Sequence, residues 1–267
     1  MKCLTVLGAL GAAALAGGAI ALYAGFYDIS ATDQHLAPTY WLLDIGMRES
    51  VKRRADKLEV PELENADRGF AIYRDHCAQC HGAPGVAPQP FALGMTPAPA
   101  NLAYTAAHWK PAELFWATKH GIKMTGMPAW KYRLSDEEIW ATVAFLKRLP
   151  LLSPVEYREL KAPPHDRGVA RDVGKPDADR GQQAINQYAC VTCHRIPGVV
   201  GANAPVGPPL AGVAARTMIA GRLPNTFDNM VRWLREPQAI DPHTAMPALG
   251  VSERDARDMA AFLAELK

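Results

Sequence analysis

The sequence carries little net charge and few cysteines. Its formal net charge is +2 over 267 residues and it has no long basic block, which argues against nucleic acid as a partner. Only five cysteines are present, and four of them fall in two short motifs, so a disulfide framework is not expected. Proline, in contrast, is abundant: its 22 copies exceed the usual share of about 5%. We therefore expect long loops and few or no regular strands.

Charge is missing altogether from Cys3 to Tyr27, a run of 25 residues. This run is longer than the roughly 20 residues that span a bilayer core and longer than the apolar core of a signal peptide, about 7–15 residues. Lys2 predicts a cytoplasmic N-terminus. We therefore predict a transmembrane anchor at 1–28, with a signal peptide as the alternative. Either one exports the rest of the chain.

The next segment, 29–61, is predicted to be a juxtamembrane helix or spacer. From Thr39 it is helical in character, with apolar residues such as Trp41 early and a basic end from Arg48 to Lys57. One interpretation is a helix that lies on the membrane surface or on a partner subunit. The other is a spacer helix with a solvated charged face.

Two motifs carry the chemistry: CAQCH at 77–81 and CVTCH at 190–194. C-x-x-C-H is the spacing of covalent haem c attachment. Two thiols on one turn reach the two vinyl groups of one porphyrin, and the next histidine is held beneath the iron. We predict two covalently bound haem c groups, with Cys77, Cys80, Cys190 and Cys193 as attachment residues and His81 and His194 as iron ligands. A shared Cys₄ zinc site is the alternative, but it does not explain the histidine after each pair.

The motifs belong to an internal repeat. Each half opens with Asp-Arg-Gly, at 67–69 and at 179–181, and later carries Met-Pro-Ala, at 127–129 and at 246–248. Each half closes with a helix that has a capping signal, Ser-x-x-Glu or Ser-x-x-Asp. We therefore predict a first haem domain at 62–152, a linker rich in proline and glycine at 153–176, and a second haem domain at 177–267.

The repeated Met-Pro-Ala supplies a second axial ligand for each iron. Methionine opposite histidine raises the reduction potential of haem iron. We predict Met127 as the partner of His81, and Met246 as the partner of His194. Rival ligands remain in both halves: Met95, Met124, His108 and His120 in the first, and Met218, Met230 and His243 in the second.

A metal-bound histidine usually donates its other ring N–H to an oxygen acceptor, which fixes the ring. In the second half, VGPPLAG at 206–212 offers backbone carbonyls for this purpose, and we predict that of Pro208. In the first half, PAPANL at 97–102 is the corresponding candidate.

With these motifs in place, both halves resemble class I cytochrome c domains. The resemblance implies an all-α fold around haem, with crossing first and last helices, His/Met iron and one-electron transfer. The second half, from GPPLAGVAAR onward, also resembles the cytochrome c domain fused to subunit II of some haem–copper oxidases. The copper-binding part of that subunit is missing, since the sequence has no second Cys/His/Met cluster.

The expected architecture is all-α: two cytochrome c-like haem domains in tandem behind a single transmembrane helix, in a bacterial inner membrane with the haem domains in the periplasm. The expected function is that of an electron carrier, not an enzyme, which relays single electrons between respiratory-chain partners. Its donor is a quinol-oxidising complex or a dehydrogenase, and its acceptor a terminal oxidase or another reductase. The alternatives are a subunit of a larger dehydrogenase or oxidase complex and a dihaem peroxidase, which requires one iron with an open sixth position.

Overall fold

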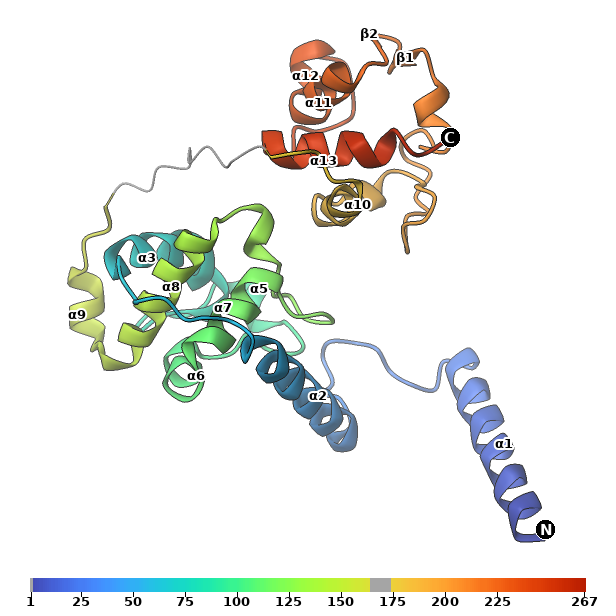
Figure 1. Cartoon of the computed structure of the whole chain (residues 1–267). Helices are drawn as coiled ribbons and strands as arrows, with labels where there is room; N and C mark the ends of the chain where they lie inside the picture. The colour runs from blue at the N-terminus through green and yellow to red at the C-terminus, as the bar shows by residue number, and fades with distance from the viewer. Residues whose placement is uncertain (1, 164–173) are drawn as a thin grey trace.

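The computed structural model describes residues 2–163 and 174–267 (Figure 1). It is mostly helical, which confirms the predicted all-α class. Within these residues the single sheet pairs β1 (Met218–Ile219) with β2 (Leu223–Pro224) in antiparallel register, two residues each.

The N-terminal helix α1 (Lys2–Tyr23) is long and apolar. It contains a 19-residue span, Thr5–Tyr23, with a mean hydropathy of 1.9 and none of its residues buried. Figure 1 shows it apart from the folded domains. A helix of this length and composition is able to cross a membrane, and a signal sequence has the same features at this position.

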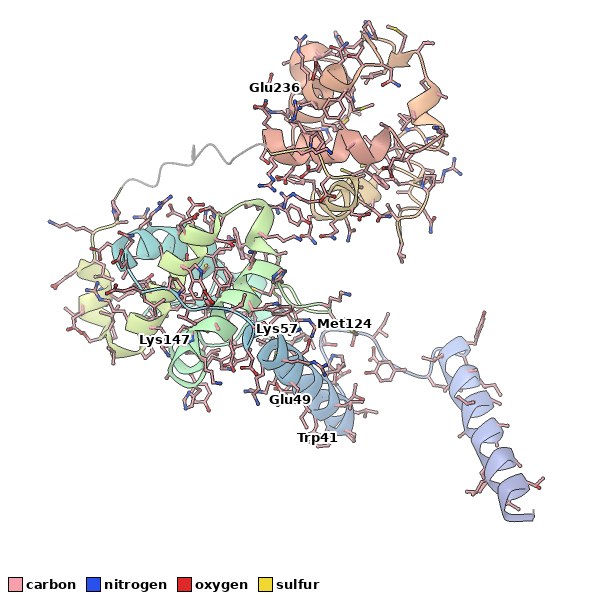
Figure 2. The ribbon with its side chains drawn as sticks, viewed as in Figure 1. Trp41, Glu49, Lys57, Met124, Lys147 and Glu236 are labelled. Atoms are coloured by element: carbon pink, nitrogen blue, oxygen red, sulfur yellow. The ribbon has the colours of Figure 1, made fainter. Side chains whose placement is uncertain are left out.

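The following helix, α2 (Ala37–Ala55), has two unlike halves. Its last turns pack against α7 (Pro111–His120), where Val51 and Ala55 are each only 2% exposed. Its first turns carry apolar side chains that face solvent, and Trp41 is 64% exposed (Figure 2). α2 is therefore part of the first folded unit at its C-terminal end and unpartnered at its N-terminal end.

In the first unit, α3 (Ala66–Ile72) crosses α8 (Asp136–Arg148) in backbone contact. A Cβ atom at Gly69 would lie 1.9 Å from the carbonyl oxygen of Ala141, so only glycine allows this approach. The Ser135 capping box that the sequence predicts is formed: the Ser135 hydroxyl accepts from Glu138 N, and Ser135 N donates to the Glu138 carboxylate. The remaining elements are η1 (Tyr73–Cys77, a π-helical turn), α4 (Ala78–His81), α5 (Pro90–Leu93), α6 (Leu102–His108), η2 (Trp130–Tyr132) and η3 (Leu149–Leu151).

The segment 153–176, expected to be a linker, begins with a short helix, α9 (Pro154–Glu159). Ser153 caps it, and Tyr157 packs edge-on against Phe70 with the ring centroids 5.6 Å apart. Tyr157 is only 8% exposed. The start of this segment thus belongs to the core of the first unit, and 164–173 lie outside the described residues.

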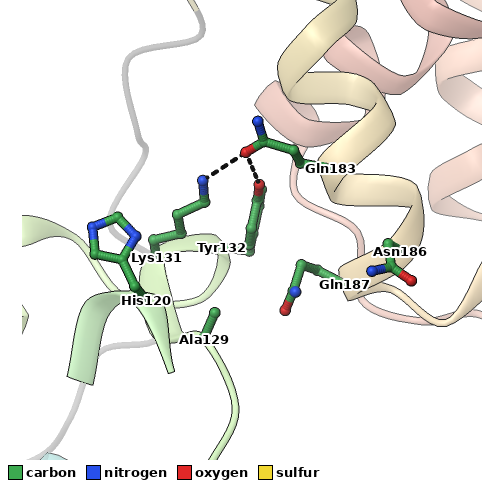
Figure 3. Close-up of a pocket in the computed structure, with 7 residues that line it drawn as sticks. All are labelled: His120, Ala129, Lys131, Tyr132, Gln183, Asn186 and Gln187. Carbon is green, nitrogen blue, oxygen red and sulfur yellow. Dashed lines mark hydrogen bonds between the residues drawn. The ribbon is translucent and has the colours of Figure 1, made fainter. Parts of the chain in front are cut away.

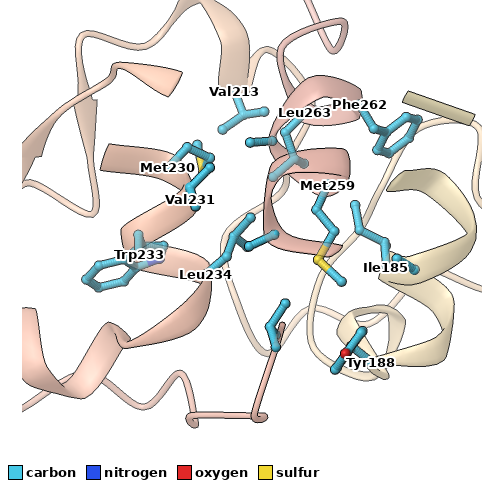
Figure 4. Packing of buried hydrophobic residues seen from close by; sticks show 14 of the residues in the cluster. Ile185, Tyr188, Val213, Met230, Val231, Trp233, Leu234, Met259, Phe262 and Leu263 are labelled. Carbon is cyan, nitrogen blue, oxygen red and sulfur yellow. The ribbon is translucent and has the colours of Figure 1, made fainter. Parts of the chain in front are cut away.

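The second unit repeats the crossing. Here α10 (Ala178–Gln187) meets α13 (Glu253–Leu263), and a Cβ atom at Gly181 would lie 2.0 Å from the carbonyl oxygen of Asp258. Figure 4 shows the core between these helices and α11 (Phe227–Arg235), with Trp233 and Met259 in it. The other elements are η4 (Cys190–Thr192), η5 (Val213–Ala215) and α12 (Pro237–Ile240).

The arginine of each Asp-Arg-Gly ties the two crossing helices together. Arg180 donates to Asp255 at 2.7 Å and to Asp258 at 2.6 Å, and both carboxylates are almost fully buried. Arg68 donates to Glu138 at 3.0 Å in the first unit. The repeat seen in the sequence is therefore a repeat of tertiary contacts.

Candidate haem-binding sites

In the first unit, α3, η1 and α4 run on from one another and deliver CAQCH at their end. Gly82 ends the turn with a φ of +63°. The buried hydroxyl of Tyr73 donates to the carbonyl of Gly82 at 2.6 Å, which fixes this end. His81 then places Nδ1 2.7 Å from the carbonyl oxygen of Ala100, within the segment 97–102 that the sequence singles out.

The second site has the same plan built on a shorter element. His194 lies two residues after the end of η4, and its backbone N–H donates to the carbonyl of Cys190 at 3.0 Å. Its Nδ1 lies 2.8 Å from the carbonyl oxygen of Pro208, the acceptor named in the sequence analysis. Gly207 lies against the ring: a Cβ atom there would be 2.4 Å from Cε1 of His194. Any larger residue would push the imidazole out of place.

These contacts fix the tautomer of both imidazoles. A carbonyl oxygen only accepts, so each Nδ1 must carry the proton and donate. Each Nε2 is then left with a lone pair, which is the form that binds a metal. Burial also lowers the pKa of His81, against the opposing effect of its bond to Ala100, so its ring is neutral at neutral pH.

The four motif cysteines are free and half-buried. Burial, with a smaller effect of the neighbouring Cys80, raises the pKa of the Cys77 thiol to about 12. Burial likewise raises the pKa of Cys190 to about 11. Both groups are therefore protonated thiols at neutral pH, and neither is held in a disulfide, so both are available for thioether formation. The donor set fits haem c in both units.

Met127 and Met246 are held in the same way, although they lie on unlike loops. The backbone N–H of Met127 donates to the hydroxyl of Thr125 at 3.1 Å, and that of Met246 donates to the hydroxyl of Thr244 at 3.2 Å. Both methionines are half-buried. The common signal, Thr-x-Met-Pro-Ala, extends the repeat by a residue that the sequence analysis missed.

The backbone of Gly121 braces the Met127 loop. A Cβ atom at Gly121 would lie 2.7 Å from the carbonyl oxygen of Met127, and Ile122 N donates to that same oxygen at 3.2 Å. Gly121 has a φ of +65°, which glycine adopts without strain. The end of α7 and the Met-Pro-Ala turn are thus fixed against each other.

The rival methionines lie in different environments. Met124 is at the tip of the same loop and is 82% exposed (Figure 2). Met230 is 8% exposed in the second core. Met95 stays a rival by position, because its side chain packs against Gly126, the residue before Met127.

Within residues 2–163 and 174–267, no three Cys, His, Asp or Glu side chains gather into a group suited to a metal ion. A shared Cys₄ zinc site requires such a group.

Two family models match this chain. Residues 64–146 match the model "Cytochrome C oxidase, cbb3-type, subunit III", and residues 178–267 match the model "Cytochrome c". Both folded units are cytochrome c domains. The chain therefore belongs to the cytochrome c family, with two domains in tandem, as predicted.

Two further similarities are weaker. The chain is 33% identical over 104 residues to a cytochrome c oxidase subunit 2 of Alkalihalophilus pseudofirmus, covering 38% of this chain and 30% of that protein. It thus spans about a third of the length of this relative. A solved structure of a reducing HAO-like protein complex from Kuenenia stuttgartiensis aligns over 78% of this chain and 99% of that chain, with 20% identity and a TM-score of 0.30.

Membership of this family implies haem c and one-electron transfer, and the cysteine pairs 77/80 and 190/193 fit C-x-x-C-H attachment sites. The cytochrome c domains indicate an electron carrier. Sequence reasoning narrowed the acceptor of His81 to 97–102 without naming Ala100, and it missed Gly207, Thr125 and Thr244. Thr-x-Met was visible as a repeat, whereas a backbone carbonyl such as that of Ala100 leaves no mark in the sequence.

Proposed function

We propose that this chain is a membrane-anchored dihaem c-type cytochrome that relays single electrons on the periplasmic side of a bacterial inner membrane. The observation that carries the proposal is the pair of matching sites. Each has a C-x-x-C-H motif whose histidine Nδ1 donates to a backbone carbonyl. Each also has a half-buried methionine held by a threonine two residues earlier.

In this proposal Cys77 and Cys80 hold one haem and Cys190 and Cys193 the other. Haem c, when bound, supplies a reversible one-electron couple at its iron. The carbonyls of Ala100 and Pro208 orient His81 and His194 toward that iron. Met127 and Met246 would hold the iron together with His81 and His194, and their binding would close it to substrates.

The proposed placement rests on α1. Its apolar span, Thr5–Tyr23, is long enough to anchor the chain, and Lys2 before it favours export of both domains. The proposed partners are redox proteins: a quinol-oxidising complex or a dehydrogenase as donor, and a terminal oxidase or another reductase as acceptor. Docking surfaces for such transient redox partners are small.

The decisive experiment is expression of the full chain with a c-type haem maturation system, followed by a haem count and optical and magnetic spectra. Two low-spin haems per chain are expected, with the weak red absorption band of methionine–iron ligation. Met127→Ala and Met246→Ala are each expected to remove part of that band and to lower one reduction potential. Met124→Ala is the matched control, because this methionine is 82% exposed on the same loop and its loss is expected to change neither property.

A high-spin iron in the unmodified chain that binds peroxide would contradict the relay at that site and favour a peroxidase. Loss of the band in Met124→Ala or in Met95→Ala, with Met127→Ala unchanged, would reassign the ligand of the first domain.

The second candidate is a cytochrome subunit of a larger oxidoreductase complex. The observation in its favour is the exposed apolar first half of α2, where Trp41 and Leu42 are 64% and 65% exposed. Purification in mild detergent separates the two: a subunit copurifies with other chains in fixed proportion, whereas a free carrier elutes alone.

A further inference from the structure

The two cytochrome c domains touch through a short segment that directly follows the Met127 turn. We call this segment, 129–133, the docking segment (Figure 3). Lys131 Nζ donates to Gln183 Oε1 at 2.9 Å, and the Tyr132 hydroxyl donates to the same oxygen at 3.2 Å. Arg133 donates to the backbone carbonyl of Gln187 at 3.1 Å. The acceptors all lie on α10, the first helix of the second domain.

Tyr132 is buried by the other domain. It is only 2% exposed, and it packs in the same cluster as Ile185 and Tyr188 of the second domain. The guanidinium of Arg180 lies 5.5 Å from the centroid of the Tyr132 ring, and that of Arg133 lies 5.0 Å from the centroid of the Tyr188 ring. Cation–π contacts of this kind add to the burial of the ring. A tyrosine buried in the core cluster of another domain marks a contact with defined geometry.

The Tyr188 hydroxyl joins the contact to the interior of the second domain. It lies 2.9 Å from a carboxylate oxygen of Asp255 and 3.3 Å from the backbone carbonyl of Tyr132. Asp255 is the buried carboxylate that also pairs with Arg180. The docking segment therefore meets the ion-pair network that fixes the crossing of α10 and α13.

The charges across the contact are not balanced locally. Burial lowers the pKa of Lys131, and the nearby cations Arg180 and Lys119 lower it further, while Asp255 opposes them. Gln183 is an exposed residue beside a polar cavity of about 170 Å³. The cavity leaves room for a side chain longer than glutamine at position 183. The effect of a substitution there is therefore expected to depend on the charge of the new side chain.

Both ends of the contact lead to a candidate haem site. The docking segment begins two residues after Met127, and Tyr188 stands two residues before Cys190. The Cys190 sulfur lies 3.9 Å from the carbonyl oxygen of Tyr188.

We propose that the docking segment and α10 form a fixed interdomain contact that keeps the two domains together, so that an electron passes between their haems within one chain. The contact itself does not depend on haem, whereas its role in electron transfer rests on the proposed function. Tyr132 and Gln183 are positioning residues in this account.

The test uses two variants of the full chain in detergent, which place opposite charges at position 183. Gln183→Arg removes the acceptor of Lys131 and Tyr132 and adds a cation beside Lys131 and Arg180. It is expected to shift the ratio of docked to undocked molecules by about tenfold or more, which the loss of two ordinary hydrogen bonds supports. Gln183→Glu keeps an acceptor oxygen and adds attraction to the same cations, so the contact is expected to persist.

Hydrogen–deuterium exchange measures the contact in the first domain, which carries no substitution. Gln183→Arg is expected to speed deuterium uptake in a peptide covering 129–134, while Gln183→Glu leaves it at the level of the unmodified chain. A peptide of α8 covering 139–146 is the internal control and is expected to be unchanged. Uptake at 129–134 that is the same in Gln183→Arg as in the unmodified chain would overturn the contact. Equal acceleration by both variants would overturn the role of the two hydrogen bonds to Gln183, because the charge at position 183 would then make no difference.

The role in electron transfer has its own readout. After rapid photoreduction of one haem, equilibration between the haems is expected to slow in Gln183→Arg and not in Gln183→Glu. Faster deuterium uptake with unchanged equilibration would overturn this role and leave the contact intact. A chain without haem c would contradict the proposed function, and the exchange measurement would still decide the contact.

Discussion

At the scale of single residues, the two methionines proposed as iron ligands are held through their backbones. In both domains the methionine N–H donates to the hydroxyl of a threonine two residues earlier, at 3.1 Å and 3.2 Å. The loops that carry these residues otherwise differ. Among the described glycines, Gly121 braces the first loop, since its backbone is pressed against Met127, and none braces the second in this way. The threonine hydroxyl is thus the shared contact that holds the backbone of each methionine.

Thr244→Val is expected to weaken the hold on Met246, because valine has the shape of threonine without the acceptor. An ordinary hydrogen bond contributes about 0.5–1.5 kcal/mol, so we expect the methionine–iron band of the second haem to disappear at a lower temperature. Thr244→Ser keeps the hydroxyl and is the matched control. Should the serine and valine variants lose the band together, the hydroxyl has no part in holding Met246. Thr125→Val and Thr125→Ser test the first domain in the same way.

At the scale of helices, the crossing of first and last helices is secured by one arginine in each domain, with unequal burial. Arg180 is 23% exposed and faces two carboxylates, Asp255 and Asp258, that are 0% and 2% exposed. Arg68 is 41% exposed and faces one carboxylate, Glu138. The same sequence signal, Asp-Arg-Gly, therefore has a much larger electrostatic role in the second domain.

Arg180→Met is expected to destabilise the second domain by about 3–5 kcal/mol, because it leaves two buried carboxylates without their counter-ion. Arg68→Met is expected to cost less, about 1–3 kcal/mol, because Arg68 is 41% exposed and pairs with a single buried carboxylate, Glu138, which keeps the backbone N–H of Ser135 as a donor. Chemical denaturation of both variants, followed at each domain, measures the difference. Similar losses in the two domains would show that neither the number of buried carboxylates nor the burial of the arginine governs these pairs.

The helices also show what a sequence reveals and what it hides. The capping box at Ser135 was predictable because it involves residues three apart, and the structure has it. The short α9 was not predicted, since its proline-rich context indicates a linker and its place depends on Tyr157 finding Phe70 far back in the chain. The acceptor for His194 was predicted at Pro208, whereas that for His81 was narrowed only to a segment. A backbone carbonyl is available at every residue, so only the fold selects Ala100.

At the scale of the whole molecule, the contact between the domains says more about their arrangement than the linker that joins them. Proline, glycine and mixed charge between 153 and 176 predict a linker and do not say how the two domains pack, while the burial of Tyr132 in the core of the second domain indicates a contact between them. Sequence patterns report local periodicity and spacing. Nothing in the sequence around Gln183 indicates that its exposed side chain accepts two hydrogen bonds from the other domain.

Removal of α1 is expected to leave the stability of the folded part unchanged. From Thr5 to Ile20 each residue of α1 is exposed, so a chain that starts at Asp28 is expected to keep the unfolding temperature of the full chain and to lose membrane attachment. A chain that starts at Leu58 also lacks α2, including Val51 and Ala55, which are buried against α7. Loss of two buried apolar side chains is expected to destabilise the first domain by a few kcal/mol, about 2 or more.

Membrane fractionation and thermal unfolding of the two truncated chains check this expectation. The informative result is the behaviour of the chain that starts at Asp28. If it stays with membranes while the chain that starts at Leu58 does not, the exposed apolar residues of α2 around Trp41 bind lipid or a membrane partner, and α1 is not the sole attachment. If both chains are released but only the shorter one unfolds early, α2 is a structural brace of the first domain and α1 carries the attachment.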